Sequence, residues 1–176
     1  MQEPTGQAYK TLIQVAMEVC DEFILVKRDQ MELEPEGYEL LERLQPFLKE
    51  IVKDDYWPGT RLMGHYADVY FFRCSPEAVD ILLSYSTSLY SWVQTRVPDD
   101  LCFLKQGQPW LINTAHERES HIVTDVEEEL NRLEESGLLF RDLSVQKFMY
   151  RQNGLQVVNS FQMKGLGVVD QREVQG

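Results

Sequence analysis

The sequence has 176 residues, of which 43% are hydrophobic and 26% charged, and its net charge at pH 7 is −12. This length is typical of one domain whose hydrophobic core needs no metal or disulfide. An acidic chain repels nucleic-acid phosphates and anionic membranes, whereas it attracts basic proteins. We therefore expect no nucleic acid and no membrane as partners. A basic protein partner remains compatible with this charge, although a role in solubility alone is the simpler interpretation.

The cysteine pattern indicates a reducing compartment. Cys20, Cys74 and Cys102 are far apart and form no Cys-x-x-Cys pair, so neither a disulfide framework nor a thiolate zinc site is expected. Their apolar neighbours are typical of buried free thiols. The first residues lack the basic and then apolar pattern of a signal peptide, and no apolar run approaches the length of a membrane span. We expect a cytoplasmic protein without a cofactor.

Two helical patterns and one strand are expected in the first third of the chain. Apolar residues at three- and four-residue spacing predict a helix over 9–20, and the short apolar run 23–26 predicts a strand that is buried on both faces. A second helical pattern starts at Pro35 and continues to Val52. Pro46 interrupts this pattern and is expected to kink or split the helix.

A loop, a strand and a third helix follow. A Pro-Gly pair indicates a loop over 56–60, and the aromatic, partly alternating segment 66–73 predicts a strand. Ser75 is a good N-cap, and Pro76 suits the first helical position, so a helix should begin here. The serine-rich stretch 84–88 is a poor helix former and is expected to end or break this helix.

A hairpin and a fourth helix are expected after residue 100. The apolar segments 101–104 and 109–112 flank a turn that contains Gly107, which predicts two antiparallel strands. Segment 126–135 has an apolar face at helical spacing, and Gly137 is placed to end the helix.

The last part of the chain differs in charge, because basic residues outnumber acidic ones from residue 138 onward. Segments 145–151 and 155–161 flank an Asn-Gly pair, which is a strong hairpin signal. We interpret 1–161 as a single domain to which 138–161 is appended as a hairpin, and residues beyond 161 (162–176) as a loose tail.

Taken in order, these elements lack the regular alternation of strand and helix that a doubly wound fold requires. We therefore predict an α+β fold with a mixed or mainly antiparallel sheet and with helices packed on one face.

Segment 116–121 contains the densest group of residues that could carry catalysis. His116 and His121 are five residues apart, which places them on different faces of a helix, unlike the four-residue spacing of the zinc-protease motif. His65 could join His116 and Glu117 in an acid–base or divalent metal site if the fold brought the three together. Isolated histidines are more often unrelated surface residues, so no metal site is predicted.

Other catalytic motifs are absent from the sequence. No serine lies in a Gly-x-Ser-x-Gly motif, and the cysteines lie in apolar patterns in which thiols are inert. The glycine-rich segment 165–170 lacks the third glycine of a dinucleotide loop and the room for the helix that should follow it. The sequence therefore favours a protein that is not an enzyme.

Aromatic and acidic residues beside loops form the candidate binding set. Trp57 and Trp110 both adjoin proline, and aromatic residues at such positions are typical of interface anchors and of core edges alike. Asp99 and Asp100 follow Pro98 and are typical of a solvated turn, although paired carboxylates can also perform acid–base chemistry or bind a cation. The full candidate set is Trp57, Arg61, Asp99, Asp100, Trp110, His116 and Glu117.

We expect a non-catalytic protein-interaction module of a bacterial type, comparable to an immunity or antitoxin-like inhibitor of a basic effector. Acidic loops that face a basic site would give fast association that depends on salt. Two alternatives stay open. One is a small hydrolase that uses His65, His116 and Glu117 with or without a metal, and the other is an acidic secretion or folding chaperone. The oligomeric state is open, and a dimer is compatible with the sequence.

Overall fold

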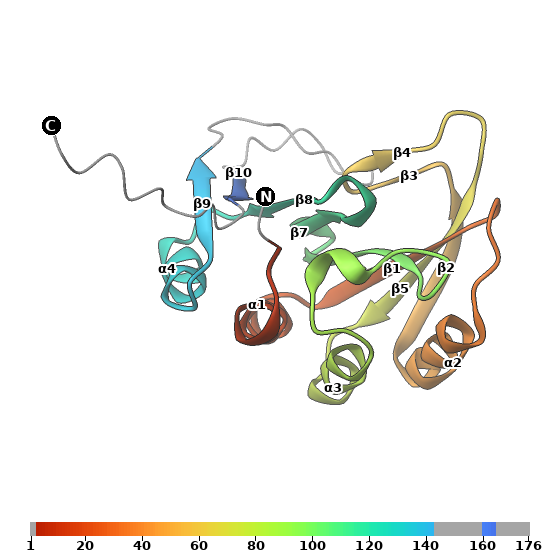
Figure 1. Cartoon of the computed structure of the whole chain (residues 1–176), viewed down its shortest axis with the longest axis horizontal. Coiled ribbons are helices and arrows are strands. Elements are labelled where there is room, and N and C mark those ends of the chain that lie inside the picture. Colours follow the sequence, from red (N-terminus) through yellow and green to blue (C-terminus); the bar gives the residue numbers. More distant parts are fainter. Residues whose placement is uncertain (1–2, 143–159, 165–176) are drawn as a thin grey trace, which may run out of the picture.

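The structure is a computed structural model that describes residues 3–142 and 160–164. It has an α+β fold in which four α-helices lie on one face of an eight-stranded antiparallel sheet (Figure 1). This confirms the predicted fold class. The helices are α1 (Gly6–Val19), α2 (Pro35–Leu44), α3 (Pro76–Tyr85) and α4 (Glu127–Glu135).

The strand order in the large sheet is β2-β5-β1-β6-β7-β8-β10-β9, and a separate two-stranded hairpin, β3–β4, packs on the face opposite the helices (Figure 1). The strands are β1 (Glu22–Arg28), β2 (Leu48–Asp54), β3 (Tyr56–Trp57), β4 (Thr60–Arg61), β5 (Ala67–Arg73), β6 (Asp99–Lys105), β7 (Gln108–Thr114), β8 (Glu119–Val123), β9 (Leu139–Asp142) and β10 (Ser160–Lys164).

Apolar side chains are buried on both faces of the sheet. On the helix side, Phe23 of β1 stacks on Phe72 of β5 with ring centroids 5.0 Å apart. On the other side, Trp57 of the hairpin is fully buried over Ile24 and Val69. The continuous apolar run of β1 follows from this arrangement, because alternate residues of the strand serve the two cores.

Residues 48–54 form a strand, so the prediction of one helical pattern from Pro35 to Val52 is wrong in its second half. Pro46 ends α2, and a 3₁₀ turn, η1 (Gln45–Phe47), redirects the chain into β2. There Ile51 pairs with Tyr70 of β5. Short apolar runs do not distinguish helix from strand by spacing alone, and pairing with β5 decided the outcome.

The third predicted helix starts and ends as expected. The Ser75 hydroxyl accepts a hydrogen bond from the Ala78 N–H at 3.1 Å, which is the N-cap bond that α3 requires. The helix α3 ends at Tyr85, inside the serine-rich stretch, and a 3₁₀ turn, η2 (Leu89–Ser91), comes after that stretch.

The polar segment around residue 117 is more ordered than a loop. A 3₁₀ turn, η3 (Ala115–Glu117), is followed by β8, which pairs with β7. At the C-terminal end, residues 162–164 of the expected tail belong to β10, which pairs with β8 and β9. The predicted strand 145–151 and most of 155–161 lie outside the described residues. No helix in the described part of the chain is both long and apolar enough to span a membrane.

Candidate functional site

Five of the predicted site residues meet around one ionic cluster, which we define as Arg28, Asp99, Asp100 and His116. The cluster lies where β1, β6 and η3 approach the β3–β4 hairpin. Trp57 reaches it from the hairpin. The cluster therefore joins four parts of the chain that are distant in sequence.

A β-bulge brings the two carboxylates together. Adjacent residues of a strand normally point to opposite faces, but β6 has one extra residue where Val26 pairs with Asp99 and Ile24 pairs with Cys102. Asp100 adopts the left-handed conformation with φ of 54°, which aspartate tolerates better than most residues. Both carboxylates consequently lie on the face that the hairpin covers.

Asp100 connects the hairpin to η3. Its carboxylate accepts hydrogen bonds from the Trp57 Nε1–H at 2.9 Å, the Ala115 N–H at 2.8 Å and the Thr60 hydroxyl at 3.4 Å. The side chain is 0% exposed. Because these donors are directed inward, the carboxylate fixes the hairpin on the sheet and offers no surface to a substrate.

Arg28 supplies the positive charge of the cluster. Its Nε lies 2.7 Å from Asp99 Oδ2 and its Nη2 lies 3.8 Å from Asp100 Oδ2. The guanidinium also lies over the Trp57 ring, 5.5 Å from the centroid. The Gln94 side chain holds the Arg28 backbone, since its Oε1 accepts from the Arg28 N–H at 2.8 Å and its Nε2 donates to the Arg28 carbonyl at 3.1 Å.

His116 and Glu117 form the outer edge of the cluster. Arg28 Nη2 lies 3.3 Å from His116 Nδ1, and His116 Nε2 lies 3.7 Å from Glu117 Oε1. The side chains of His116 and Glu117 are 38% and 59% exposed. Solvent thus reaches the cluster through the histidine and the arginine, while the two aspartates stay inside.

The environment of the aspartates favours their protonated forms. Burial and the negative charge of Asp100 raise the pKa of Asp99 to about 6, although the Gln94 N–H and Arg28 oppose this effect. Burial also raises the pKa of Asp100, against the hydrogen bonds that its carboxylate accepts. A single arginine faces two carboxylates, so the pair retains a proton more readily than exposed aspartates do.

The structure corrects the interpretation of Asp99 and Asp100 as a solvated turn, because both side chains are buried at the start of β6. Trp57 and Trp110 are also buried, at 0% and 1% exposure. None of these four side chains can contact a partner in this conformation. Arg61 is exposed on β4, where its guanidinium lies over the ring of Tyr56.

Trp110 belongs to a second buried polar group at the other end of the sheet. Its Nε1–H donates to Glu129 of α4 at 2.7 Å, and the Thr124 hydroxyl donates to the same carboxylate oxygen at 2.6 Å. Lys105 lies 2.9 Å from the other oxygen. Burial alone would raise the pKa of Glu129, but these contacts outweigh it and the pKa is lowered. This group attaches α4 to the sheet.

The residues of the hydrolase alternative, His65, His116 and Glu117, come from two separate segments of the chain. His65 lies exposed between β4 and β5, whereas His116 and Glu117 lie on η3. Within residues 3–142 and 160–164, no group of three His, Cys, Asp or Glu side chains is arranged to hold a metal ion.

Sequence reasoning missed Arg28 and Gln94, which complete the cluster. Arg28 is the last residue of the buried strand β1, and a charged residue at such a position usually indicates only that the strand ends there. Gln94 lies in an irregular segment and contacts β1 from 66 positions away in the sequence. No local pattern could have indicated either contact.

The turn of the β3–β4 hairpin depends on Gly59. Its φ is +86°, and a Cβ there would lie 2.6 Å from Thr114 Oγ1 and 2.9 Å from Ile112 Cγ2. We expect Gly59→Ala to lower the free energy of unfolding by about 2 kcal/mol, from backbone strain and overpacking together. Denaturant titration measures this loss.

Gly64→Ala is the matched control for that change. Gly64 also has a positive φ, +78°, but a Cβ there would meet no atom within 4 Å. This variant should lose only the part that comes from backbone strain, about 1 kcal/mol. Equal losses in both variants would show that the close approach to Thr114 has no energetic weight.

Comparison of the chain with protein-family models, with curated proteins and with solved structures found no match.

Proposed function

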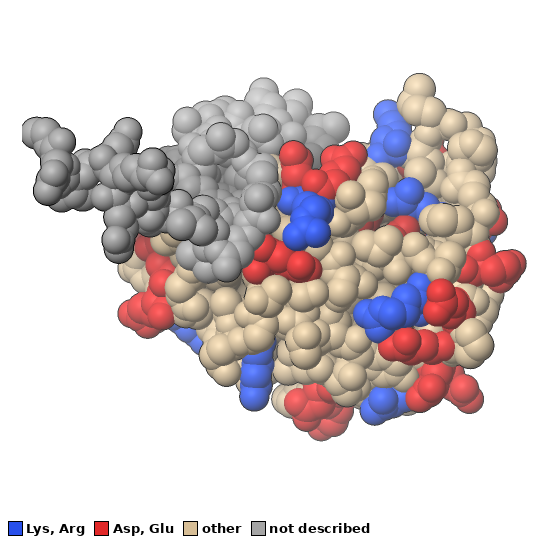
Figure 2. Space-filling view, in the orientation of Figure 1, with Lys and Arg blue, Asp and Glu red and all other residues tan. Residues whose placement is uncertain are grey.

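We propose that this chain is a non-catalytic protein-interaction module that binds a basic protein, in the way that an immunity or antitoxin-like inhibitor binds a basic effector. The observation that supports this most is the outer face of α2, where an exposed aromatic side chain lies among glutamates. Figure 2 shows acidic side chains at the lower right of the molecule, where α2 lies in Figure 1, with basic side chains among them.

The aromatic anchor of this face is Tyr38, which is 44% exposed. Its hydroxyl donates a hydrogen bond to Glu32 at 2.6 Å, which restrains the ring. On the edge strand β2, Ile51 is 48% exposed and pairs in register with Tyr70 of β5. Exposed apolar side chains therefore lie both on α2 and on the edge strand β2. Exposed aromatic side chains of this kind are typical interface anchors because they bury a large area with few rotatable bonds.

Exposed carboxylates lie on α2 and in the segment that precedes it. Among the described residues, only Glu36 of this group takes part in an ion pair, with Arg96 at 2.6 Å. Exposed carboxylates contribute little affinity one by one, but together they attract a basic partner and accelerate association in low salt. The glutamates of this acidic face, all exposed, are Glu32, Glu34, Glu36, Glu39 and Glu42.

The burial of Asp99 and Asp100 supports the non-catalytic part of the proposal. A catalytic carboxylate must come within hydrogen-bonding distance of the reacting group. These two side chains are 2% and 0% exposed and are occupied by Arg28, Trp57 and backbone N–H groups. The paired carboxylates that suggested acid–base chemistry thus act as a structural anchor for the hairpin.

The test is affinity capture from an extract of the source organism with the immobilised chain, in low and high salt. We expect one basic protein to be retained in stoichiometric amount in low salt and released in high salt. The triple variant Tyr38→Ala, Glu39→Gln, Glu42→Gln should reduce its affinity about tenfold or more, because the anchor and two charges are removed. Affinity is then measured with the purified partner.

The control variant carries Val126→Ala, Glu127→Gln and Glu128→Gln at α4. It removes one exposed apolar side chain and two negative charges, as the triple variant does, but from a different surface. We expect this control variant to bind the partner with the affinity of the unmodified chain. Hen egg-white lysozyme serves as a control basic protein, which should not be retained in stoichiometric amount. Equal weakening by both variants, or no captured partner in low salt, would contradict the proposal.

A further inference from the structure

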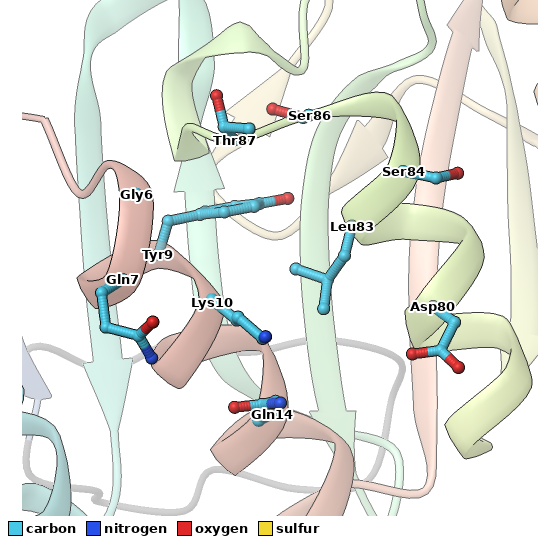
Figure 3. Close-up of a pocket in the computed structure, with 10 residues that line it drawn as sticks. All are labelled: Gly6, Gln7, Tyr9, Lys10, Gln14, Asp80, Leu83, Ser84, Ser86 and Thr87. Carbon is cyan, nitrogen blue, oxygen red and sulfur yellow. The ribbon is translucent and has the colours of Figure 1, made fainter.

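A hollow of about 510 Å³ lies between α1 and α3, on the helix layer and away from the ionic cluster (Figure 3). Its size is within the range of sites for small molecules. Lys10 and Gln14 project into it from α1, and Asp80 and Ser84 line it from α3 (Figure 3). Leu83 and the ring of Tyr9 supply apolar surface, and the other side chains that line the hollow are polar.

Two opposite charges face one another across this hollow. The ammonium of Lys10 and the carboxylate of Asp80 point into it from opposite walls (Figure 3). Both residues are exposed, and neither takes part in an ion pair within the described part of the chain. Each charge is therefore available to a ligand.

The walls of the hollow are held in place at one end. The Gly6 N–H donates to the Thr87 carbonyl at 2.9 Å, and Thr5 forms a β-bridge with Ser88. Beneath them Tyr9, which is 1% exposed, accepts a hydrogen bond from Trp92 Nε1 at 3.0 Å. A ligand would thus meet a site that is already formed, which lowers the entropic cost of binding.

We propose that this hollow binds a short, zwitterionic peptide, with the ligand carboxylate on Lys10 and the ligand ammonium on Asp80. A simple anion would be repelled by Asp80 and a simple cation by Lys10, whereas a molecule with both charges satisfies both walls. The amide of Gln14 and the hydroxyl of Ser84 can bond to the peptide groups between the two ends. This site is independent of the acidic face on α2.

The probe is the dipeptide alanyl-glutamine, titrated into the full chain and followed by backbone amide NMR shifts. We expect saturable shifts confined to residues 6–14 and 80–87. Acetylation of the ligand amine or amidation of its carboxylate should each weaken binding about tenfold, because each removes one charge-assisted contact. No saturable shift with the unmodified dipeptide, or equal binding of the blocked forms, would overturn the proposal.

Protein variants test the two charges separately. Lys10→Gln and Asp80→Asn should each weaken binding about tenfold, and the charge exchange Lys10→Asp with Asp80→Lys should recover most of it by reversing the ligand. Asp125→Asn, at an exposed site elsewhere, should leave binding unchanged. If the charge-exchange variant bound the dipeptide no better than the single variants do, the proposal of a zwitterionic ligand would be wrong.

Discussion

Replacement of Asp100 by alanine is expected to lower the free energy of unfolding by about 4 kcal/mol, as is usual when one partner of a buried ionic group is removed. The change leaves the N–H groups of Trp57 and Ala115 without an acceptor in the interior. It also places alanine at a φ of 54°, where a β-carbon is strained. The hairpin would lose its main polar connection to the sheet.

Asp100→Asn separates these effects. Asparagine tolerates the left-handed conformation as aspartate does, and one of its two terminal atoms still accepts a hydrogen bond. We expect a smaller loss of about 2 kcal/mol, because one buried N–H donor then faces an NH₂ group. Denaturant titration of both variants, with Asp125→Ala as an exposed control, measures the difference. If Asp100→Ala changed stability no more than Asp125→Ala, the cluster would have no structural role.

The second large effect concerns pH and Asp99. Its pKa in the folded chain is about 6, above the ordinary value of 3.8. The folded state therefore holds this proton more tightly than the unfolded state. The stability contributed by protonation is fully present below about pH 4 and is lost as pH rises through about 6, with a total of about 3 kcal/mol.

The comparison with Asp99→Asn reports the contribution of the Asp99–Asp100 pair, because the titrating groups outside the ionic cluster are common to both proteins. Asparagine cannot titrate, and any constant cost of the substitution affects both pH values equally. The stability of the unmodified chain relative to the variant should be greater at about pH 4.5 than at about pH 7.5, by about 2 kcal/mol. A difference that does not depend on pH would show that Asp99 titrates as an exposed aspartate does.

Much of the fold follows from local sequence. Ser75 and Pro76 set the start of α3 by a cap that one hydroxyl provides, and the run 23–26 of β1 is apolar because both faces of the strand are covered. The hairpin of β6 and β7 lies where Gly107, with a φ of +76°, permits the turn. Such signals depend on neighbours in the chain and can be recognised without the tertiary structure.

The candidate site could be predicted only in part. Residue types in the sequence point to Asp99, Asp100, Trp57 and His116, yet the local pattern predicts a solvated turn for the two aspartates. The bulge in β6, the hairpin above it and Arg28 from β1 put them in the interior instead. Burial is a property of the whole packing arrangement, so no local pattern could separate an acidic turn from a buried carboxylate pair.

By itself the sequence determined the fold class, α+β, and the acidic charge of the chain. Its local signals also predicted most of the helices and turns that the structure has in its described residues. Tertiary structure decided which charges are free and which are occupied. The glutamates of α2 point outward because their helix buries its other face, whereas Asp99 and Asp100 are covered by a hairpin that begins more than 40 residues earlier. Long-range contacts set solvent exposure, and exposure decides whether a carboxylate supports the fold or is available to a partner.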